Sequence, residues 1–112
     1  MAKFTINNVE LEFNIFDAEN AEKYEAQVEK MRQVGEEAAK ETSLSKIIRK
    51  QCGAIFEFID ALFGEGTSEK LFGGHTNLVD CANVYYKIID EIKKDSSALP
   101  TLNREQRRKS KK

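Results

Sequence analysis

The sequence predicts a mainly α-helical fold in which an N-terminal β-hairpin packs on a core of three helices. Residues 4–15 alternate between apolar and polar side chains around an Asn pair, three later segments repeat apolar residues at helical spacing, and a basic end follows residue 95. A chain of 112 residues has the length of one domain. We therefore expect residues 1–95 to form a single domain and residues 96–112 to form a flexible basic tail.

The hairpin is predicted over about residues 3–16. Two apolar residues precede the pair Asn7-Asn8 and four follow it, in alternation with polar residues: Phe4, Ile6, Val9, Leu11, Phe13 and Ile15. Asn tolerates the positive φ angles that a two-residue hairpin turn requires. Because an isolated hairpin is only marginally stable, its apolar face must lie on a helix, and the segment 44–63 is the best candidate. Without the hairpin the fold would be all-α.

The first helix is predicted from a cap at Asp17 or Asn20 to about Lys40. Its apolar residues are spaced three and four apart, which makes a narrow stripe: Ala21, Tyr24, Val28, Met31, Gly35 and Ala38. The rest of its surface is charged and mainly acidic. The simpler interpretation is a helix packed on one side only. The alternative is that Tyr24, Val28 and Met31 bind a partner helix or a second copy of the chain.

The second helix is predicted over residues 44–63, after a cap at Thr42 or Ser43. Its apolar residues form two rows and a flank, so we expect it at the centre of the core: Ile48, Cys52, Ile55, Ile59 and Leu62; Leu44, Ile47, Ala54, Phe58 and Ala61; Phe56 and Phe63. Gly53 costs this helix about 1 kcal/mol relative to Ala. We therefore expect the next helix to cross close to Gly53.

The last helix is predicted to begin at a cap formed by Thr76 or Asn77, with Asp80 placed nearly as in a capping box. Its apolar residues make a stripe with a widened flank: Leu78, Cys81, Tyr85, Ile88 and Ile92, with Val79, Ala82 and Ile89. We expect this helix to pack on the core as well.

Residues 63–75 form a glycine-rich connector between the two most apolar helices. Thr67 or Ser68 can begin a single helical turn within it. We expect Phe63 and Phe72 to anchor the connector in the core, while its glycines permit the chain to reverse. A groove beside Phe63 and Phe72 is the second partner-binding surface that the sequence suggests.

The residues give no basis for catalysis, a cofactor or a metal site. His75 is the only histidine, and nothing places a nucleophile beside it. Cys52 and Cys81 lie within apolar helical patterns, where we expect buried free thiols, and a structural zinc site needs more soft ligands in closer pairs. No window approaches the roughly 20 apolar residues of a membrane span, and the first residues, Met-Ala-Lys-Phe-Thr, do not have the apolar stretch typical of a signal peptide. We expect a non-enzymatic cytoplasmic protein.

The C-terminal end separates charge along the chain. Six basic residues against Glu105 give residues 103–112 a charge of +5, which leaves −6 on the preceding 102 residues when the total is −1. Such an end is most simply a solubilising tail. Its basic side chains could contact phosphates, but no aromatic residue is interleaved for base stacking, so nucleic-acid binding is the weaker interpretation: Arg104, Arg107, Arg108 and Lys109.

Three stretches of the chain resemble small tail-region proteins of siphophages and prophages of Gram-positive bacteria. They are the N-terminal segment Phe-Thr-Ile-Asn-Asn-Val-Glu-Leu-Glu-Phe, the loop Phe-Gly-Glu-Gly-Thr-Ser-Glu-Lys-Leu-Phe-Gly-Gly with Thr-Asn-Leu after it, and the basic end Asn-Arg-Glu-Gln-Arg-Arg-Lys. Within that group the chain is most similar to the tail assembly chaperones, which are small and mainly helical. The resemblance covers most of the chain, and the glycine loop is its most specific part.

This resemblance implies a non-structural assembly factor in the host bacterial cytoplasm. Such a factor binds the long helical tape measure protein, keeps it soluble and helps to recruit tail tube subunits. Apolar stripes on a free tape measure associate unless they are covered, and helix-in-groove contacts would cover them. Two alternatives stay open: a structural virion component such as a head–tail connector or minor tail protein, and a small DNA-binding phage protein that uses the basic tail.

Overall fold

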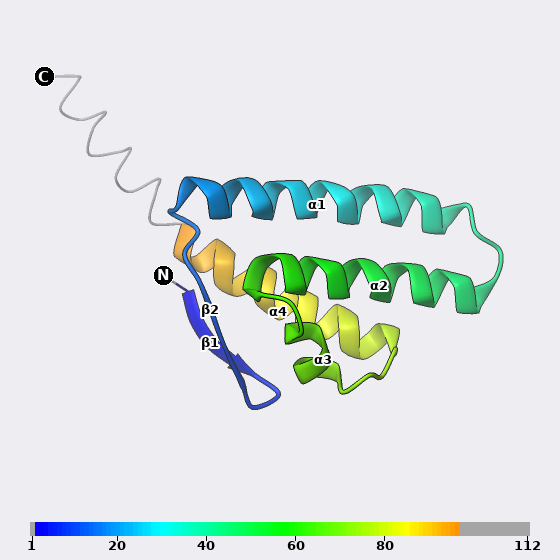
Figure 1. Cartoon of the computed structure of the whole chain (residues 1–112). Coiled ribbons are helices and arrows are strands. Elements are labelled where there is room, and N and C mark those ends of the chain that lie inside the picture. Colours follow the sequence, from blue (N-terminus) through cyan, green and yellow to red (C-terminus); the bar gives the residue numbers. More distant parts are fainter. Residues whose placement is uncertain (1, 97–112) are drawn as a thin grey trace, which may run out of the picture.

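The computed structural model describes residues 2–96. Two strands and four helices follow one another along the chain: β1 Ala2–Ile6, β2 Val9–Phe13, α1 Ala18–Ala39, α2 Leu44–Phe63, α3 Thr67–Phe72 and α4 Leu78–Ser96. The three long helices form the body, and the hairpin lies on the half that contains the end of α4 (Figure 1). The predicted mainly α fold with an N-terminal hairpin is confirmed. The predicted tail beyond Ser96 lies outside the described residues.

The hairpin turns at the Asn pair, as predicted. Asn7 and Asn8 have φ angles of 49° and 64°, and the antiparallel strands pair Ile6 with Val9. Both angles lie in the left-handed region that a two-residue turn needs between right-twisted strands. The apolar face of the hairpin points into the protein, with β2 packed against α2 and β1 packed against α4. The hairpin therefore rests on two helices, not on α2 alone.

Side-chain caps fix the starts of the three long helices. Asp17 Oδ1 accepts hydrogen bonds from the backbone N–H groups of Glu19 and Asn20 at 3.0 and 3.3 Å. Ser43 Oγ caps α2, and Asn77 Oδ1 accepts from Asp80 N at 3.1 Å at the start of α4. Each cap satisfies N–H groups that have no partner inside the helix. Each capping residue is one of the two that the sequence offered.

The glycine-rich connector contains the short helix α3, whose cap comes from α2. Asp60 accepts hydrogen bonds from the backbone N–H of Ser68 at 2.9 Å and from its hydroxyl at 3.0 Å. After α3 the chain reverses through Gly73 and Gly74, which have φ angles of 59° and 83°. Phe72 is buried, so it anchors this connector in the core as expected.

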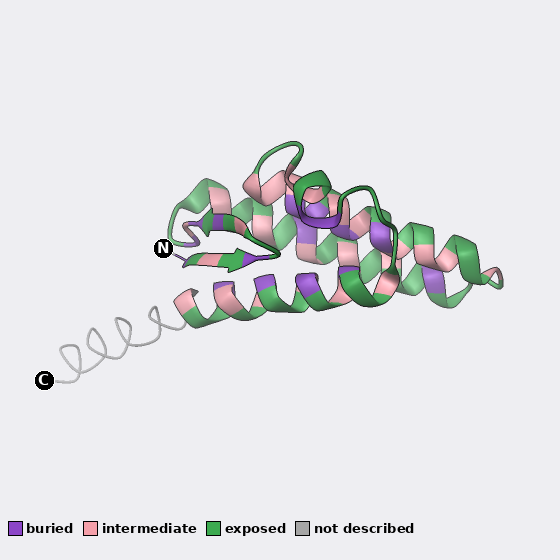
Figure 2. Ribbon diagram, turned by 90° about the horizontal axis from the view of Figure 1, so that it is seen from below, coloured by how far each residue is buried: buried purple, intermediate pink, exposed green. Residues whose placement is uncertain are grey.

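The core lies where α2 meets α4 and the hairpin (Figure 2). α2 packs against α1, α3, α4 and β2, which confirms its predicted central position. The largest fully buried side chains all come from α2 and α4: Phe58, Ile59, Ile88, Ile92, Cys52 and Cys81. Burial of each large aliphatic or aromatic side chain contributes roughly 1.5–3 kcal/mol. These two helices therefore dominate the stability of the fold.

Three predictions about the helix surfaces are wrong. Gly53 is exposed, and a Cβ atom there would meet nothing within 4 Å, so no helix of the described chain crosses at Gly53 and nothing within residues 2–96 explains this glycine. Leu44 is 72% exposed because the end of the α1–α2 pair projects beyond the start of α4 (Figure 1). Val79 is 67% exposed because it lies on the side of α4 away from the core.

Within residues 2–96, no helix combines the length and the apolar content that a membrane span requires.

Candidate functional site

The candidate site is an apolar groove between α1 and α4. Both helices pack against α2 but barely contact each other, so α2 forms the floor of the space between them. The groove has a volume of about 390 Å³. Its lining comes from all three helices: Val28, Met31, Arg32, Val34 and Gly35 of α1, Gln51 and Ile55 of α2, and Leu78, Ala82, Tyr85 and Tyr86 of α4. A hollow of this size can accept a few apolar side chains from a partner.

Aromatic side chains close one end of the groove. Tyr24 of α1 and Tyr85 of α4 both contact Phe58 of α2 in edge-on geometry, with ring centroids 6.3 and 5.1 Å apart. Burial raises the pKa of both tyrosines, and for Tyr85 the neighbouring Tyr24 and Tyr86 hydroxyls add to this effect. The chain has three tyrosines and no tryptophan. Tyr85 and Tyr86 line the groove and Tyr24 lies at its aromatic end, so every tyrosine is in or beside the groove.

Gly35 lowers the α1 wall of the groove. It lies about one turn before the C-terminal end of α1, and a Cβ atom built on it would meet nothing within 4 Å among the described residues. Glycine destabilises a helix interior by roughly 1 kcal/mol relative to Ala. Within residues 2–96, no backbone segment crosses close enough to require glycine here. Its effect is to leave open the space beside Met31.

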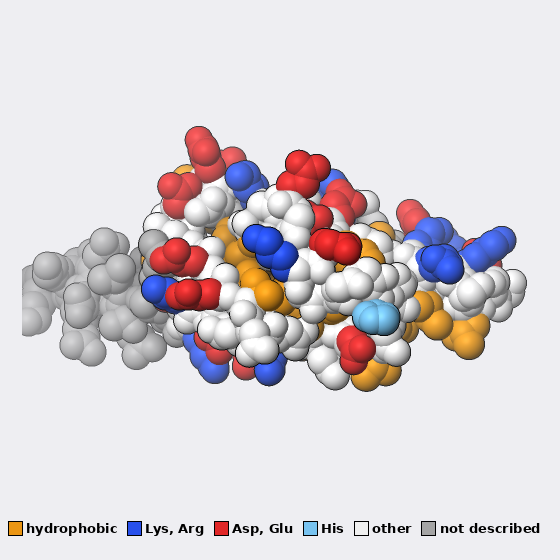
Figure 3. Space-filling view, turned by 60° about the horizontal axis from the view of Figure 1, so that its bottom comes forward, with side chains coloured by type: hydrophobic (Ala, Val, Ile, Leu, Met, Phe, Trp, Pro, Cys, Tyr) orange, Lys and Arg blue, Asp and Glu red, His pale blue; other side chains and the backbone are white. Residues whose placement is uncertain are grey.

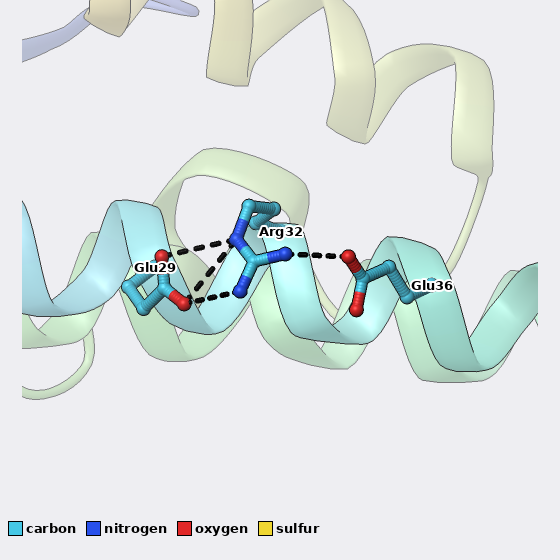
Figure 4. Close-up of polar contacts among 3 residues, drawn as sticks. All are labelled: Glu29, Arg32 and Glu36. Atoms are coloured by element: carbon cyan, nitrogen blue, oxygen red, sulfur yellow. Dashed lines mark hydrogen bonds and ion pairs between the residues drawn. The ribbon is translucent and has the colours of Figure 1, made fainter.

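The exposed edge of α1 along the groove carries an ionic network. Arg32 lines the groove and pairs with Glu29 one turn before it and with Glu36 one turn after it (Figure 4). The Arg32 guanidinium lowers the pKa of the Glu29 carboxyl by hydrogen bonding and by its charge. Glu25 lies one turn before Glu29 on the same edge, and its side chain has no ion pair or hydrogen bond within the described residues. This edge therefore has a net negative charge.

The edge contributed by α4 is apolar. Tyr86 lines the groove and is 67% exposed, and Val79 precedes it by two turns on the same side of α4. Figure 3 shows hydrophobic atoms at the surface on the right of the molecule, the end at which α4 begins and the α1–α2 pair projects beyond it. The two edges of the groove thus differ in character, with carboxylates on α1 and exposed apolar groups on α4.

The residues predicted to bind a partner fall into two places. Val28 and Met31 line the groove, and Tyr24 belongs to the aromatic cluster at its closed end, so the α1 stripe is brought together there. Phe63 lies elsewhere and packs edge-on against Phe4 and Phe13 of the hairpin. Phe72 is buried and contacts Phe56. The structure does not bring these two phenylalanines to the groove.

The second predicted surface, beside the connector, is a smaller hollow of about 330 Å³. Phe63 is its aromatic member, and the strand β2 contributes two carboxylates, Glu10 and Glu12. Lys3 already pairs with Glu10 at 3.2 Å. Because charged side chains surround it, this hollow is less suited to an apolar helix than the groove is. The predicted basic contacts Arg104, Arg107, Arg108 and Lys109 lie outside the described residues.

A polar hollow near the hairpin turn contains His75. Asp80, Asn83 and Lys87 of α4 line it together with Asn7. Among the described residues, no group of three or more His, Cys, Asp and Glu side chains is arranged to hold a metal ion.

Cys52 and Cys81 are adjacent buried free thiols at the α2–α4 contact. Both are fully inaccessible to solvent. Burial, together with the neighbouring Cys52 thiol, raises the pKa of Cys81 to about 12. A thiolate is the reactive form of cysteine, so these residues act as core side chains.

Comparison with known protein families identifies the family of the chain. A family described as being of unknown function, DUF6673, matches residues 7–111. The chain belongs to the DUF6673 family. No curated protein and no solved structure matches it. The family match spans every residue that lines the groove, so the groove lies inside the DUF6673 domain.

Some groove residues of this DUF6673 protein were not predicted from its sequence. Tyr85 was assigned to the core stripe of α4, although it also faces the groove, and Tyr86 was assigned no role. The sequence does contain a signal for Tyr86. Two adjacent residues of an amphipathic helix point about 100° apart, so one of the two neighbouring tyrosines must lie away from the core. Arg32 could not be found in this way, because its position follows from the space between α1 and α4.

Proposed function

We propose that this protein is a non-enzymatic phage tail assembly chaperone that acts in the host bacterial cytoplasm. Its groove receives apolar side chains from helical segments of the tape measure protein and so prevents those segments from associating with one another. Recruitment of tail tube subunits is the second part of this role. Two observations support this proposal: the resemblance of the sequence to tail assembly chaperones and the apolar groove between α1 and α4.

The single observation that best supports a binding role is the presence of a glycine, Gly35, in the part of α1 that lines the groove. A glycine there lowers helix stability and leaves an apolar space open, while no neighbouring group in the fold needs that space. Exposed apolar surface and a destabilising residue at the same place are explained by a bound partner. Val28, Met31 and Tyr86 then supply the apolar contacts around it.

A matched pair of glycine variants tests the groove. Gly35→Leu fills it, whereas Gly53→Leu adds the same side chain to a helix surface that does not line it. Neither substitution meets a neighbouring atom within 4 Å at the Cβ position, and leucine forms helix better than glycine by roughly 0.8 kcal/mol. Both variants should therefore be at least as stable as the parent, and only Gly35→Leu should lose the partner.

The assay is co-expression with the tape measure protein encoded nearby, followed by affinity purification. We expect the parent and Gly53→Leu to increase the soluble fraction of the tape measure and to co-purify with it, and Gly35→Leu to do neither. An unchanged soluble fraction with every variant would reject the proposal. Mass spectrometry of purified particles separates the main alternative, because a structural virion component would be present at a fixed ratio.

A further inference from the structure

We infer that the groove selects an amphipathic helix that carries Lys or Arg along one flank of its apolar stripe. This inference rests on the proposed binding role and specifies the partner segment. It follows from the unequal edges of the groove: the edge on α1 is acidic, and the edge on α4 is apolar. A helix in the groove would turn its basic flank toward α1 and its apolar stripe toward Ile55, Tyr86 and the gap at Gly35.

The acidic edge follows from the spacing of α1. Glu25, Glu29, Arg32 and Glu36 recur at intervals of three and four residues, so they form one row along the helix. This row runs beside the stripe that contains Val28, and Arg32 shows that it borders the groove. Three carboxylates against one guanidinium leave an excess of two negative charges.

The carboxylates of this row are not equivalent. Arg32 donates hydrogen bonds to Glu29 and Glu36, including one from Nε to Glu29 Oε2 at 3.1 Å, and so holds both along the helix surface (Figure 4). Glu25 has no such partner within the described residues and lies near the closed, aromatic end of the groove, directly after Tyr24 and about one turn before Val28. Glu25 is therefore the carboxylate available to an incoming cation without breaking an existing pair.

Among the described residues, none that α4 contributes to the groove lining is charged. Val79 and Tyr86 occupy the exposed edge of α4 over its first turns, and both are 67% exposed. A helix with basic residues on both flanks would desolvate cations against these apolar groups, which is unfavourable. A helix with acidic residues on the α1 side would meet like charge. A helix with basic residues on one flank only is thus compatible with both edges of the groove.

Two designed peptides provide the test. Each is about 18 residues long, roughly five turns of helix, with leucines at helical spacing and no aromatic residue; one carries lysines along a single flank and the other carries glutamates there. Because every tyrosine of the protein lies in or beside the groove, intrinsic tyrosine fluorescence reports binding directly. The full chain is titrated with each peptide at low and at high salt.

We expect the lysine peptide to bind about fivefold more tightly at low salt, with the difference shrinking as salt screens exposed charges. Glu25→Lys should remove most of the preference. Glu65→Lys, an equal charge change in the α2–α3 connector away from the groove, should preserve it. Equal binding of the two peptides, or a preference that survives in Glu25→Lys, would overturn the inference.

The glycine pair distinguishes failure of this inference from failure of the proposed function. If both peptides bind equally and Gly35→Leu abolishes both, the groove is a helix-binding site without charge selection, and only the inference falls. If Gly35→Leu leaves peptide binding unchanged, the groove is not the binding site, and both the inference and the proposed function fall.

Two further results would assign the groove to another occupant. A dimer in sedimentation that Gly35→Leu dissociates would assign it to a second copy of the chain. Tighter peptide binding after removal of residues 97–112 would assign it to the chain's own basic end.

Discussion

The side chain of Asn7 in the hairpin turn donates a hydrogen bond from Nδ2 to the backbone carbonyl oxygen of Leu71, 64 residues later in the chain, at 3.0 Å. The same residue has a φ angle of 49°. Asn7 therefore does two things at once: it permits the tight turn and it fastens that turn to α3. This contact links the hairpin to the connector that precedes α4.

The two turn asparagines should respond differently to mutation. Asn7→Ala loses the bond to Leu71 and places alanine at a positive φ, so we expect it to lower the free energy of unfolding by about 1–3 kcal/mol. Asn8→Gly keeps the turn geometry, with Asn-Gly a favoured pair, and should change stability little. Urea denaturation followed by circular dichroism measures both. Equal losses in the two variants would mean that the bond to Leu71 contributes nothing.

The reversal after α3 should require glycine. Gly73→Val and Gly74→Val each place a β-branched residue at a positive φ, and we expect each to cost roughly 1–3 kcal/mol. A valine at Gly53 provides the control, because that position has ordinary helical geometry and open space. Denaturant midpoints of the three variants give the comparison. A fully stable Gly73→Val, Gly74→Val double variant that no longer bound the tape measure would show that the connector is itself the binding surface.

The thiols of Cys52 and Cys81 should resist modification in the native protein. Both side chains are buried, and the pKa of Cys81 is raised to about 12, so the reactive thiolate is scarce at neutral pH. We expect an aromatic disulfide reagent to label them only as fast as the α2–α4 contact opens, and rapidly in denaturant. Ser45→Cys, on the exposed start of α2, should react at once in the native state. Comparable native-state rates for Cys81 and for Ser45→Cys would show that the core opens readily.

Stability should fall at alkaline pH because of the tyrosines beside the groove. Burial raises the pKa of Tyr24 and Tyr85 in the folded state above the ordinary value of 10.0. The folded protein thus holds these phenolic protons more tightly than the unfolded chain does. The contribution of these two pKa shifts to the free energy of unfolding is fully present below pH 10. It is lost as the pH rises through the folded-state pKa values.

Ultraviolet absorbance of the phenolate gives the titration, and denaturation at several pH values gives the stability. Tyr85→Phe should show a shallower decline than the parent protein above pH 10, since one shifted group is removed. An identical decline in both proteins would mean that other groups, such as the lysines, account for the pH dependence.

Local patterns were sufficient to predict the elements of this fold. The Asn pair and the alternation around it predicted the hairpin turn, and the residues at the helix starts predicted the caps at Asp17, Ser43 and Asn77. In each case the decisive interaction joins residues within about one turn of chain. Such interactions depend on residue type and spacing, which a sequence displays directly.

The groove could be predicted only in part. The spacing of Val28 and Met31 showed that one face of α1 is apolar, but periodicity does not say what covers such a face. Here α2 covers part of it, and a groove separates the rest from α4, because α1 and α4 both pack on α2 and barely contact each other. The same limit explains Val79 and Gly53, whose surroundings depend on where distant helices pass.

The contact between β1 and α4 has a consequence for synthesis. Strand β1 packs against α4, which ends about ninety residues later in the chain, so the apolar face of β1 is not fully covered until α4 has been translated. During that interval the hairpin can rest only on α2. The part of the core between β1 and α4 can therefore form only after α4 has left the exit tunnel and packed against the hairpin.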